Sequence, residues 1–133
     1  MADAQIEALK RIYAAVQAKD TDELSRSVAH DIEWVLPESV PWGGTHHGNL
    51  GVESVAELFQ EHVEGYWADP EDFIEAGDRV VVLGRISGRG RRSGRDFDLP
   101  FAHVWSFADG VPSRFHAYFD ATPILAALDA SEA

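Results

Sequence analysis

The sequence RDFDLPFAHVWSFADG, residues 95–110, alternates between two kinds of side chain. The larger side chains share one parity, and they are Phe97, Leu99, Phe101, His103, Trp105 and Phe107. A period of two is typical of a β-strand with one buried face. The stretch therefore predicts a strand whose inner face is lined by rings, with His103 as the polar exception. The final Ala108-Asp109-Gly110 predicts a tight hairpin turn.

The segments around this strand predict further antiparallel strands. The expected strands lie around 73–75, over 79–86 and over 113–119. The stretch 88–94, rich in glycine and arginine, is expected to form a hairpin tip. The last strand leads into Asp120, and Thr122-Pro123 then predicts the first turn of a short terminal helix.

The N-terminal half shows the helical period instead. Apolar residues spaced three or four apart predict helices at about 3–18, from Asp20 and over 52–66. Between the second and third of these helices we expect a strand at 32–36 and a loop at 37–51. Asp20 with Glu23 three residues later is typical of a helix N-terminus. Helices followed by a run of strands indicate an α+β fold, with the helices on one face of a curved sheet.

Length and composition fit a single domain over residues 1–133, with 45% hydrophobic residues and a tail at 129–133 that is expected to fray. The net charge of −12 repels phosphate backbones and anionic membranes, so neither nucleic acid nor a membrane is an expected partner. Without cysteine there is no disulfide or thiolate metal site. The sequence shows no signal peptide and no membrane-spanning run, so a cytoplasmic location is expected.

Several strings, in their order and spacing, point to a known family. They are YAAVQAKD (13–20), HDIEW (30–34), GTHHG (44–48), AHVWSFADG (102–110) and FDATP (119–123). Together they resemble the SnoaL-like polyketide cyclase and ketosteroid isomerase-related family of the nuclear-transport-factor-two-like superfamily. The resemblance implies a cone, in which a curved antiparallel sheet wraps three to four helices and encloses an apolar pocket. It also implies a homodimer through the outer sheet face.

His103 and Asp120 are the candidate catalytic residues. The parity of its strand points His103 into the cone, where the resemblance implies contact with a substrate oxygen. The resemblance also implies a basic aspartate at the end of the last strand, where Asp120 stands. A carboxylate buried among rings has a raised pKa, which suits removal of a proton next to a carbonyl. The alternative is that His103 is a satisfied core histidine and Asp120 only caps the terminal helix.

The sequence departs from the steroid isomerases of this group. Leu36 stands about where they carry a basic aspartate at the end of the first strand, and Glu38 lies two residues further on. Their phenol donor on the first helix matches Ile12, so Tyr13 is one position out of phase. Steroid isomerase chemistry is therefore not expected.

The other candidate site residues are mostly aromatic. The expected substrate-binding residues are Tyr13, Trp34, Trp42, His46, Phe59, Trp67, Phe101, Trp105 and His116. The tryptophans form either a pocket wall or simply core, and Trp42, in a Pro-Trp-Gly-Gly loop, is a candidate lid. His116 faces either the pocket or the dimer interface. The adjacent His46 and His47 point apart, so no metal is expected.

One hairpin gathers much of the positive charge of the chain, in Arg85, Arg89, Arg91, Arg92 and Arg95. This hairpin is either a docking patch for an anion or a partner, or a solvated tip, and we prefer the second interpretation. The sequence has no glycine-rich phosphate loop and no Gly-x-Ser-x-Gly motif. Nucleotide binding and covalent hydrolysis are therefore not expected.

These observations leave three hypotheses. The leading one is an enzyme of the isomerase, cyclase or lyase type that acts on a small apolar carbonyl compound, without a cofactor, by acid–base chemistry of Asp120 and His103. The second is a non-catalytic dimeric module that binds an apolar or aromatic metabolite. The third is a protein-interaction scaffold that uses the outer sheet face and the arginine hairpin.

Overall fold

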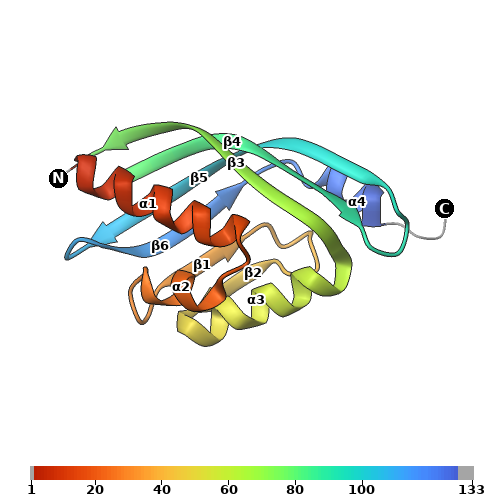
Figure 1. Ribbon diagram of the computed structural model, residues 1–133, viewed down its shortest axis with the longest axis horizontal. Helices are drawn as coiled ribbons and strands as arrows, with labels where there is room; N and C mark the ends of the chain where they lie inside the picture. Colours follow the sequence, from red (N-terminus) through yellow and green to blue (C-terminus); the bar gives the residue numbers. More distant parts are fainter. Residues whose placement is uncertain (1, 129–133) are drawn as a thin grey trace.

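The computed structural model describes residues 2–128, and four helices pack against one six-stranded sheet (Figure 1). The helices are α1 (Ala2–Gln17), α2 (Thr21–Arg26), α3 (Gly48–His62) and α4 (Thr122–Leu128). The strands are β1 (Glu33–Leu36), β2 (Gly44–His47), β3 (Val63–Ala76), β4 (Arg79–Gly90), β5 (Asp96–Ala108) and β6 (Val111–Tyr118). The predicted α+β class, with a curved sheet around four helices, is confirmed.

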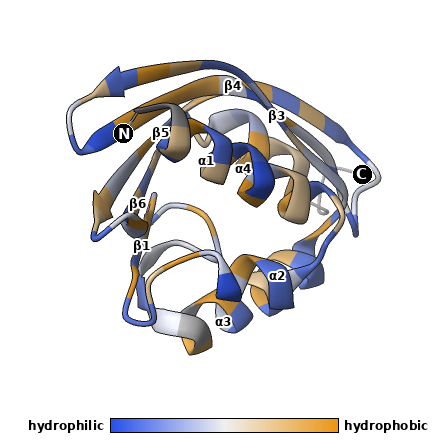
Figure 2. Cartoon of the chain, turned by 60° about the vertical axis from the view of Figure 1, so that its left-hand side comes forward, coloured by the Kyte–Doolittle hydropathy of each residue, from blue (hydrophilic) through white to orange (hydrophobic). Residues whose placement is uncertain are grey.

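The strands follow one another across the sheet in the order β2-β1-β6-β5-β4-β3. Every neighbouring pair is antiparallel except β1 and β6, which run parallel, a pair that the sequence did not predict. In Figure 2, β3 and β4 arch over α1 and α4, while α2 and α3 lie at the opposite side. The sheet is open, with β2 and β3 as its edges, and its concave face is turned toward the helices.

The alternation in β5 is the one that the sequence predicted. The side chains of its larger parity are buried, and those between them are exposed or half-buried. His103 pairs with Val82 of β4 and Ala117 of β6, which are both buried. These pairs place His103 in the middle of the concave face, because directly paired residues point to the same side of a sheet.

The third helix ends earlier than predicted. The chain leaves the helix after His62 and continues as β3, so Tyr66 and Trp67 lie on a strand. Gly65 adopts a φ of 64°, a left-handed conformation that glycine reaches without strain, and the pairing with β4 shifts register around it. The apolar side chains read as a continuing helical stripe are inward positions of this bulged strand, with Val63 buried and Tyr66 half-buried.

The segment from 37 to 51 is not the continuous loop that the sequence predicted. Residues Gly44–His47 form β2, which pairs with β1, and α3 begins at Gly48. His46 Nε2–H donates to the main-chain carbonyls of Trp42 and Gly43, each at 3.1 Å. These bonds fold the remaining loop back onto the end of β2, which fixes the position of Trp42.

The two shorter helices begin where the sequence predicted. The Oδ1 atom of Asp20 accepts a hydrogen bond from the main-chain N–H of Glu23 at 3.1 Å, which caps α2. Helix α4 begins at Thr122, and the predicted frayed tail at 129–133 lies outside the described residues. Within residues 2–128, no helix is long and apolar enough to span a membrane. The cytoplasmic location stays a prediction.

Candidate functional site

A cavity of about 330 Å³ lies between the concave face of the sheet and the helices. Its ring-bearing lining residues are Tyr13, Trp34, Trp42, Phe59, Tyr66, Phe97, His103, Trp105, Phe115 and Phe119. Its exposed lining residues come from the connection between α1 and α2 and from the junction of α3, β3 and β4, and they are Lys19, Asp20, Gln60, Gly65 and Arg91. The cavity therefore has an aromatic interior and a polar mouth.

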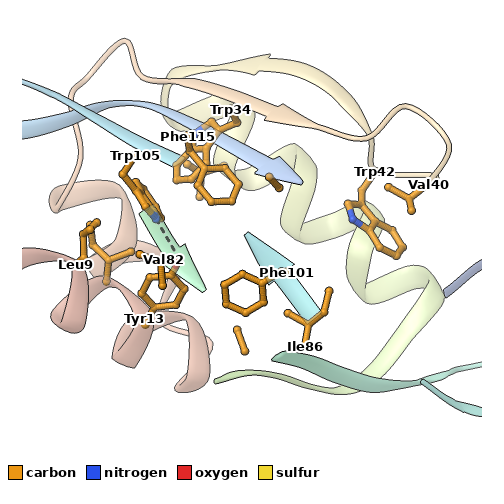
Figure 3. Packing of buried hydrophobic residues seen from close by; sticks show 14 of the residues in the cluster. Leu9, Tyr13, Trp34, Val40, Trp42, Val82, Ile86, Phe101, Trp105 and Phe115 are labelled. Atoms are coloured by element: carbon orange, nitrogen blue, oxygen red, sulfur yellow. Dashed lines mark hydrogen bonds between the residues drawn. The ribbon is translucent and has the colours of Figure 1, made fainter. Parts of the chain in front are cut away.

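Three side chains form a hydrogen-bonded chain in the wall of this cavity. Trp105 Nε1–H donates to Tyr13 Oη at 3.0 Å, and the same oxygen lies 2.6 Å from His103 Nδ1 (Figure 3 shows the bond between Trp105 and Tyr13). Tyr13 reaches the sheet from α1 and is only 3% exposed. One residue from a helix and two from β5 are therefore held in fixed relative positions.

This network assigns the proton on His103. Burial raises the pKa of the Tyr13 phenol, so the hydroxyl keeps its proton. Its oxygen accepts from Trp105, and its own proton has an acceptor only in Nδ1 of His103, among the described residues. With Nδ1 accepting, the neutral imidazole carries its hydrogen on Nε2.

The surroundings keep His103 neutral. Burial lowers the pKa of His103 to about 3, because the imidazolium would lose its hydration among aromatic rings. The Phe101 ring stacks on the imidazole at 3.9 Å between centroids, and the Phe115 ring meets it edge-on at 4.7 Å. The Nε2–H of His103 has no hydrogen-bond partner in the described part of the chain, and the residue lines the cavity. His103 therefore offers one N–H donor to a ligand.

The structure brings together part of the predicted site. The predicted residues that line the cavity are Tyr13, Trp34, Trp42, Phe59, His103 and Trp105. Tyr13 faces inward although its neighbour Ile12 matches the family's phenol position, since both residues are buried between α1 and the sheet. Trp42 is 2% exposed and packs against the Phe59 ring at 4.6 Å, so it belongs to the wall and not to an exposed lid.

Asp120 does not lie in the cavity. Its carboxylate is exposed at the end of β6, where it accepts hydrogen bonds from the main-chain N–H of Thr122, at 3.0 Å, and from the Thr122 hydroxyl. These bonds lower the pKa of Asp120, whereas a base buried in the pocket needs a raised one. The structure therefore gives Asp120 the capping role that was its alternative in the sequence.

Four predicted binding residues also lie outside the cavity lining. His46 holds the loop carbonyls described above. Phe101 is buried behind the imidazole of His103, on which it stacks. Trp67, at 48% exposure, and His116 both point to the convex face of the sheet, by the register of β3 and β6 with their neighbours. His116 is therefore not a pocket residue.

The sequence did not single out Tyr66, which lines the cavity from β3. Burial raises the pKa of its phenol, so the hydroxyl stays protonated. No described residue is a hydrogen-bond partner of that hydroxyl, and the Tyr66 ring stands edge-on to the ring of Phe59 at 4.4 Å. Its inward direction depends on the bulge at Gly65, because a regular strand with Val63 inward would place Tyr66 on the opposite face.

The cavity holds little charge. Among the described lining residues Asp20 is the one carboxylate, and it stands exposed at the mouth, where it caps α2. Within residues 2–128, no three histidine or carboxylate side chains gather as a metal site needs. The donors of the interior therefore act without a neighbouring negative charge.

Several arginines of the hairpin are paired with groups of the same chain. Arg85 Nε lies 2.8 Å from Asp98, and Arg89 Nε lies 3.1 Å from Asp96, in exposed pairs across β4 and β5. Arg91 donates to a main-chain carbonyl near the end of α3 at 2.9 Å. These contacts support the interpretation of a solvated hairpin tip.

A curved, open sheet wrapped around an aromatic cavity, with helices on its concave side, is the ketosteroid isomerase-like fold. The chain belongs to the SnoaL-like domain family, whose model matches residues 9–114. No curated protein matches the sequence.

Solved structures agree with this placement. An NTF2-like protein of unknown function from Burkholderia pseudomallei is 28% identical and has a TM-score of 0.89, with 95% of this chain and 98% of that chain covered. TerC, co-crystallised with polyporic acid, is 31% identical, with the same coverage and a TM-score of 0.88. A protein from Catenulispora acidiphila with a ketosteroid isomerase-like fold, in complex with trimethylamine, is 18% identical, covers 92% of each chain, and has a TM-score of 0.80.

Proposed function

We propose that the protein binds a small, neutral, largely apolar carbonyl compound and performs cofactor-free acid–base chemistry on it, of the isomerase or cyclase type. The family supports small-molecule chemistry of this general kind. One observation carries the proposal, namely the hydrogen-bonded chain from Trp105 through Tyr13 to His103. It ends on the Nε2–H of His103, which has no partner among residues 2–128 and lies in an aromatic cavity. Such a donor is what a carbonyl oxygen needs.

In the proposed reaction, His103 Nε2–H donates to the carbonyl oxygen of the ligand. When the C–H bond next to the carbonyl breaks, its electron pair forms the enolate and negative charge gathers on that oxygen. A donor already in position stabilises this charge more strongly than it stabilises the neutral ketone. Tyr13 orients the imidazole and Trp105 orients Tyr13, so neither needs to move during the reaction.

The proposal assigns the released proton to Asp20, the carboxylate of the cavity mouth. An asparagine caps a helix as well as an aspartate does, so Asp20→Asn keeps the start of α2 and removes the base. We expect this variant to bind ligand within about twofold of the wild type. Enolisation should fall by about tenfold or more, within the usual contribution of a general base. An unchanged enolisation rate would contradict the role of Asp20.

The experiment uses β-tetralone, a neutral bicyclic ketone with acidic hydrogens next to its carbonyl. One NMR titration in D₂O measures binding from line broadening and enolisation from loss of those hydrogens. We expect His103→Gln to weaken binding by about tenfold, the usual scale for one lost hydrogen bond, and to slow exchange by about a hundredfold. His47→Gln, at an exposed position whose side chain makes no capping bond, is the matched control. Equal exchange in wild type and His103→Gln would contradict the proposed donor.

A non-catalytic binding module is the second candidate, and a specific observation favours it. No carboxylate lines the interior among the described residues, and a histidine with a pKa of about 3 is a weak base. TerC was co-crystallised with polyporic acid, and the Catenulispora protein is in complex with trimethylamine, so proteins of this fold take small molecules. Saturable binding of β-tetralone with exchange at the buffer rate would select this candidate.

We also propose that the chain forms a homodimer through the convex face of the sheet. The exposed side chains of Ile74, Leu83 and Tyr118 lie there, and the register places Val81 and Val104 between them. A continuous apolar band across several strands is typical of a surface that a second copy covers. Sedimentation velocity should show a dimer that Leu83→Glu converts to monomer. Leu50→Glu on α3, where Leu50 is 78% exposed, should leave it dimeric.

A further inference from the structure

We propose that the cavity recognises its ligand at two separate positions, with the Tyr66 hydroxyl as the second contact. The ligand is then a neutral aromatic or alicyclic compound with a carbonyl at one end and a second oxygen elsewhere on its ring system. This inference rests on the proposed function, because it adds a second contact to the carbonyl that His103 binds.

The backbone and the neighbouring rings hold the Tyr66 side chain in one position. The left-handed Gly65 precedes it and sets the direction of the bulged strand. The Tyr66 ring packs edge-on against Phe59, and the Phe59 ring in turn packs against Trp42, so the phenol is fixed by two successive aromatic contacts. Its hydroxyl has no partner among the described residues, and the residue lines the cavity. A ligand oxygen is the partner that this geometry leaves open.

Tyr66 lines the same cavity as the hydrogen-bonded side chains Trp105, Tyr13 and His103. The two contacts nevertheless come from different parts of the wall. His103 lies on β5 and pairs with Val82, whereas Tyr66 lies near the start of β3, where that strand pairs with the far end of β4. A single ligand oxygen therefore does not serve both donors.

The balance of donors and acceptors defines the class of ligand. His103 offers Nε2–H and Tyr66 offers O–H, and the buried Trp34 Nε1–H, which also lines the cavity, lacks an acceptor as well. Among the described lining residues, the one carboxylate is Asp20 at the mouth. His103 Nε2–H and Trp34 Nε1–H can only donate, whereas the Tyr66 hydroxyl can donate or accept. The two groups that only donate favour a ligand oxygen over an amine N–H, which would lose its hydrogen bonds to water.

The test compares β-tetralone with a set of its isomers hydroxylated at different positions of the aromatic ring. Because one position places the added oxygen at Tyr66, we expect at least one isomer to bind wild type about five- to thirtyfold more tightly than β-tetralone. Tyr66→Phe keeps the ring packing and removes only the hydroxyl. It should abolish this gain and leave the affinity for β-tetralone itself within about twofold. Tyr118→Phe, at an exposed tyrosine, is the matched control.

The outcomes separate this inference from the proposed function. If no isomer gains affinity, or if the gain persists in Tyr66→Phe, the second contact is wrong while the carbonyl contact stands. If His103→Gln leaves the affinities of all the ketones unchanged, the proposed function fails independently of Tyr66. Tighter binding of tetramethylammonium than of any ketone would overturn the ligand class, since a cation held by aromatic faces needs no donor.

Discussion

A tyrosine lies beside a histidine on each of the two faces of the sheet. On the concave face Tyr13 Oη lies 2.6 Å from His103 Nδ1, and both residues are buried. On the convex face Tyr118 Oη lies 3.2 Å from His116 Nδ1, the two rings stack at 4.1 Å, and Tyr118 is 51% exposed. The residue types and the atoms that meet are the same, so the difference between the pairs comes from their surroundings.

The inner pair is fixed and the outer pair is not. Burial alone lowers the pKa of His103 to about 3. The pKa of His116 is lowered by partial burial and by Arg114, while Glu33 opposes them. In the single chain solvent reaches the outer hydroxyl, whereas the inner one is buried and held by Trp105. His103 keeps its Nε2–H as a donor because it is buried beside Tyr13, whose oxygen already accepts from Trp105 and whose proton goes to His103 Nδ1.

Acid provides the strongest test of this comparison. His103 has a folded pKa of about 3 against 6.5 in the unfolded chain, so above pH 6.5 both states are neutral and it has no effect. As the pH falls, the unfolded chain takes the proton first, and the free energy of unfolding drops by about 1.4 kcal/mol per pH unit. Urea unfolding between about pH 7 and pH 4 should show a shallower loss for His103→Gln than for the wild type. The same slope for both proteins would contradict the burial of a neutral His103. His116→Gln should lessen the slope only slightly, because the pKa of the half-buried His116 is lowered as well but without full burial.

Removing one hydroxyl from each pair gives a smaller effect. Tyr13→Phe leaves Trp105 Nε1–H and His103 Nδ1 without their partner, so we expect a loss of about 1–3 kcal/mol in the free energy of unfolding. Tyr118→Phe exposes no buried group and should change it by less than about 0.5 kcal/mol. Chemical denaturation of both variants measures the two losses. Equal losses would contradict the claim that the buried hydrogen bonds of Tyr13 stabilise the fold more than the exposed one of Tyr118.

The ion pairs of the convex face rank below both hydroxyls. Arg114 Nε lies 2.7 Å from Glu33 across β6 and β1, and both side chains are more than a third exposed. Water and salt screen such a pair, so Arg114→Ala should lower the free energy of unfolding by less than about 1 kcal/mol. The loss should shrink further in high salt, and a loss that grows with salt would contradict a screened surface pair.

The sequence predicted the elements whose patterns are local. The period of two in β5 predicted the strand, its inner face and the inward direction of His103. Burial of one face of a strand produces that period in the sequence. The cap at Asp20 was also predicted, since a cap depends on residues three positions apart. The partner of His103 was harder to predict, because Tyr13 stands ninety positions earlier in the chain.

The errors arose where one local pattern fits two structures. Val63 and Tyr66 extend the apolar stripe of α3, yet they point inward equally well from a bulged strand, and the turn at Gly65 decides between the two. Residues 119–123 are good capping sequence and also match the position of a family base. Which description holds depends on the direction in which β6 ends relative to the cavity, and this direction is set by the curvature of the whole sheet.

The smallest expected effect tests this last point. Asp120 lies outside the cavity and holds the first turn of α4 through Thr122, and an asparagine oxygen accepts the same hydrogen bonds. Asp120→Asn should therefore leave the affinity for β-tetralone and its hydrogen exchange within about twofold of the wild type. Asp20→Asn, which changes the carboxylate at the mouth, should slow the exchange in the same assay. A tenfold loss in Asp120→Asn, with Asp20→Asn unaffected, would move the base to the outer end of β6. The concave face would then supply only the donor, and the division between an inner chemical face and an outer structural face would fail.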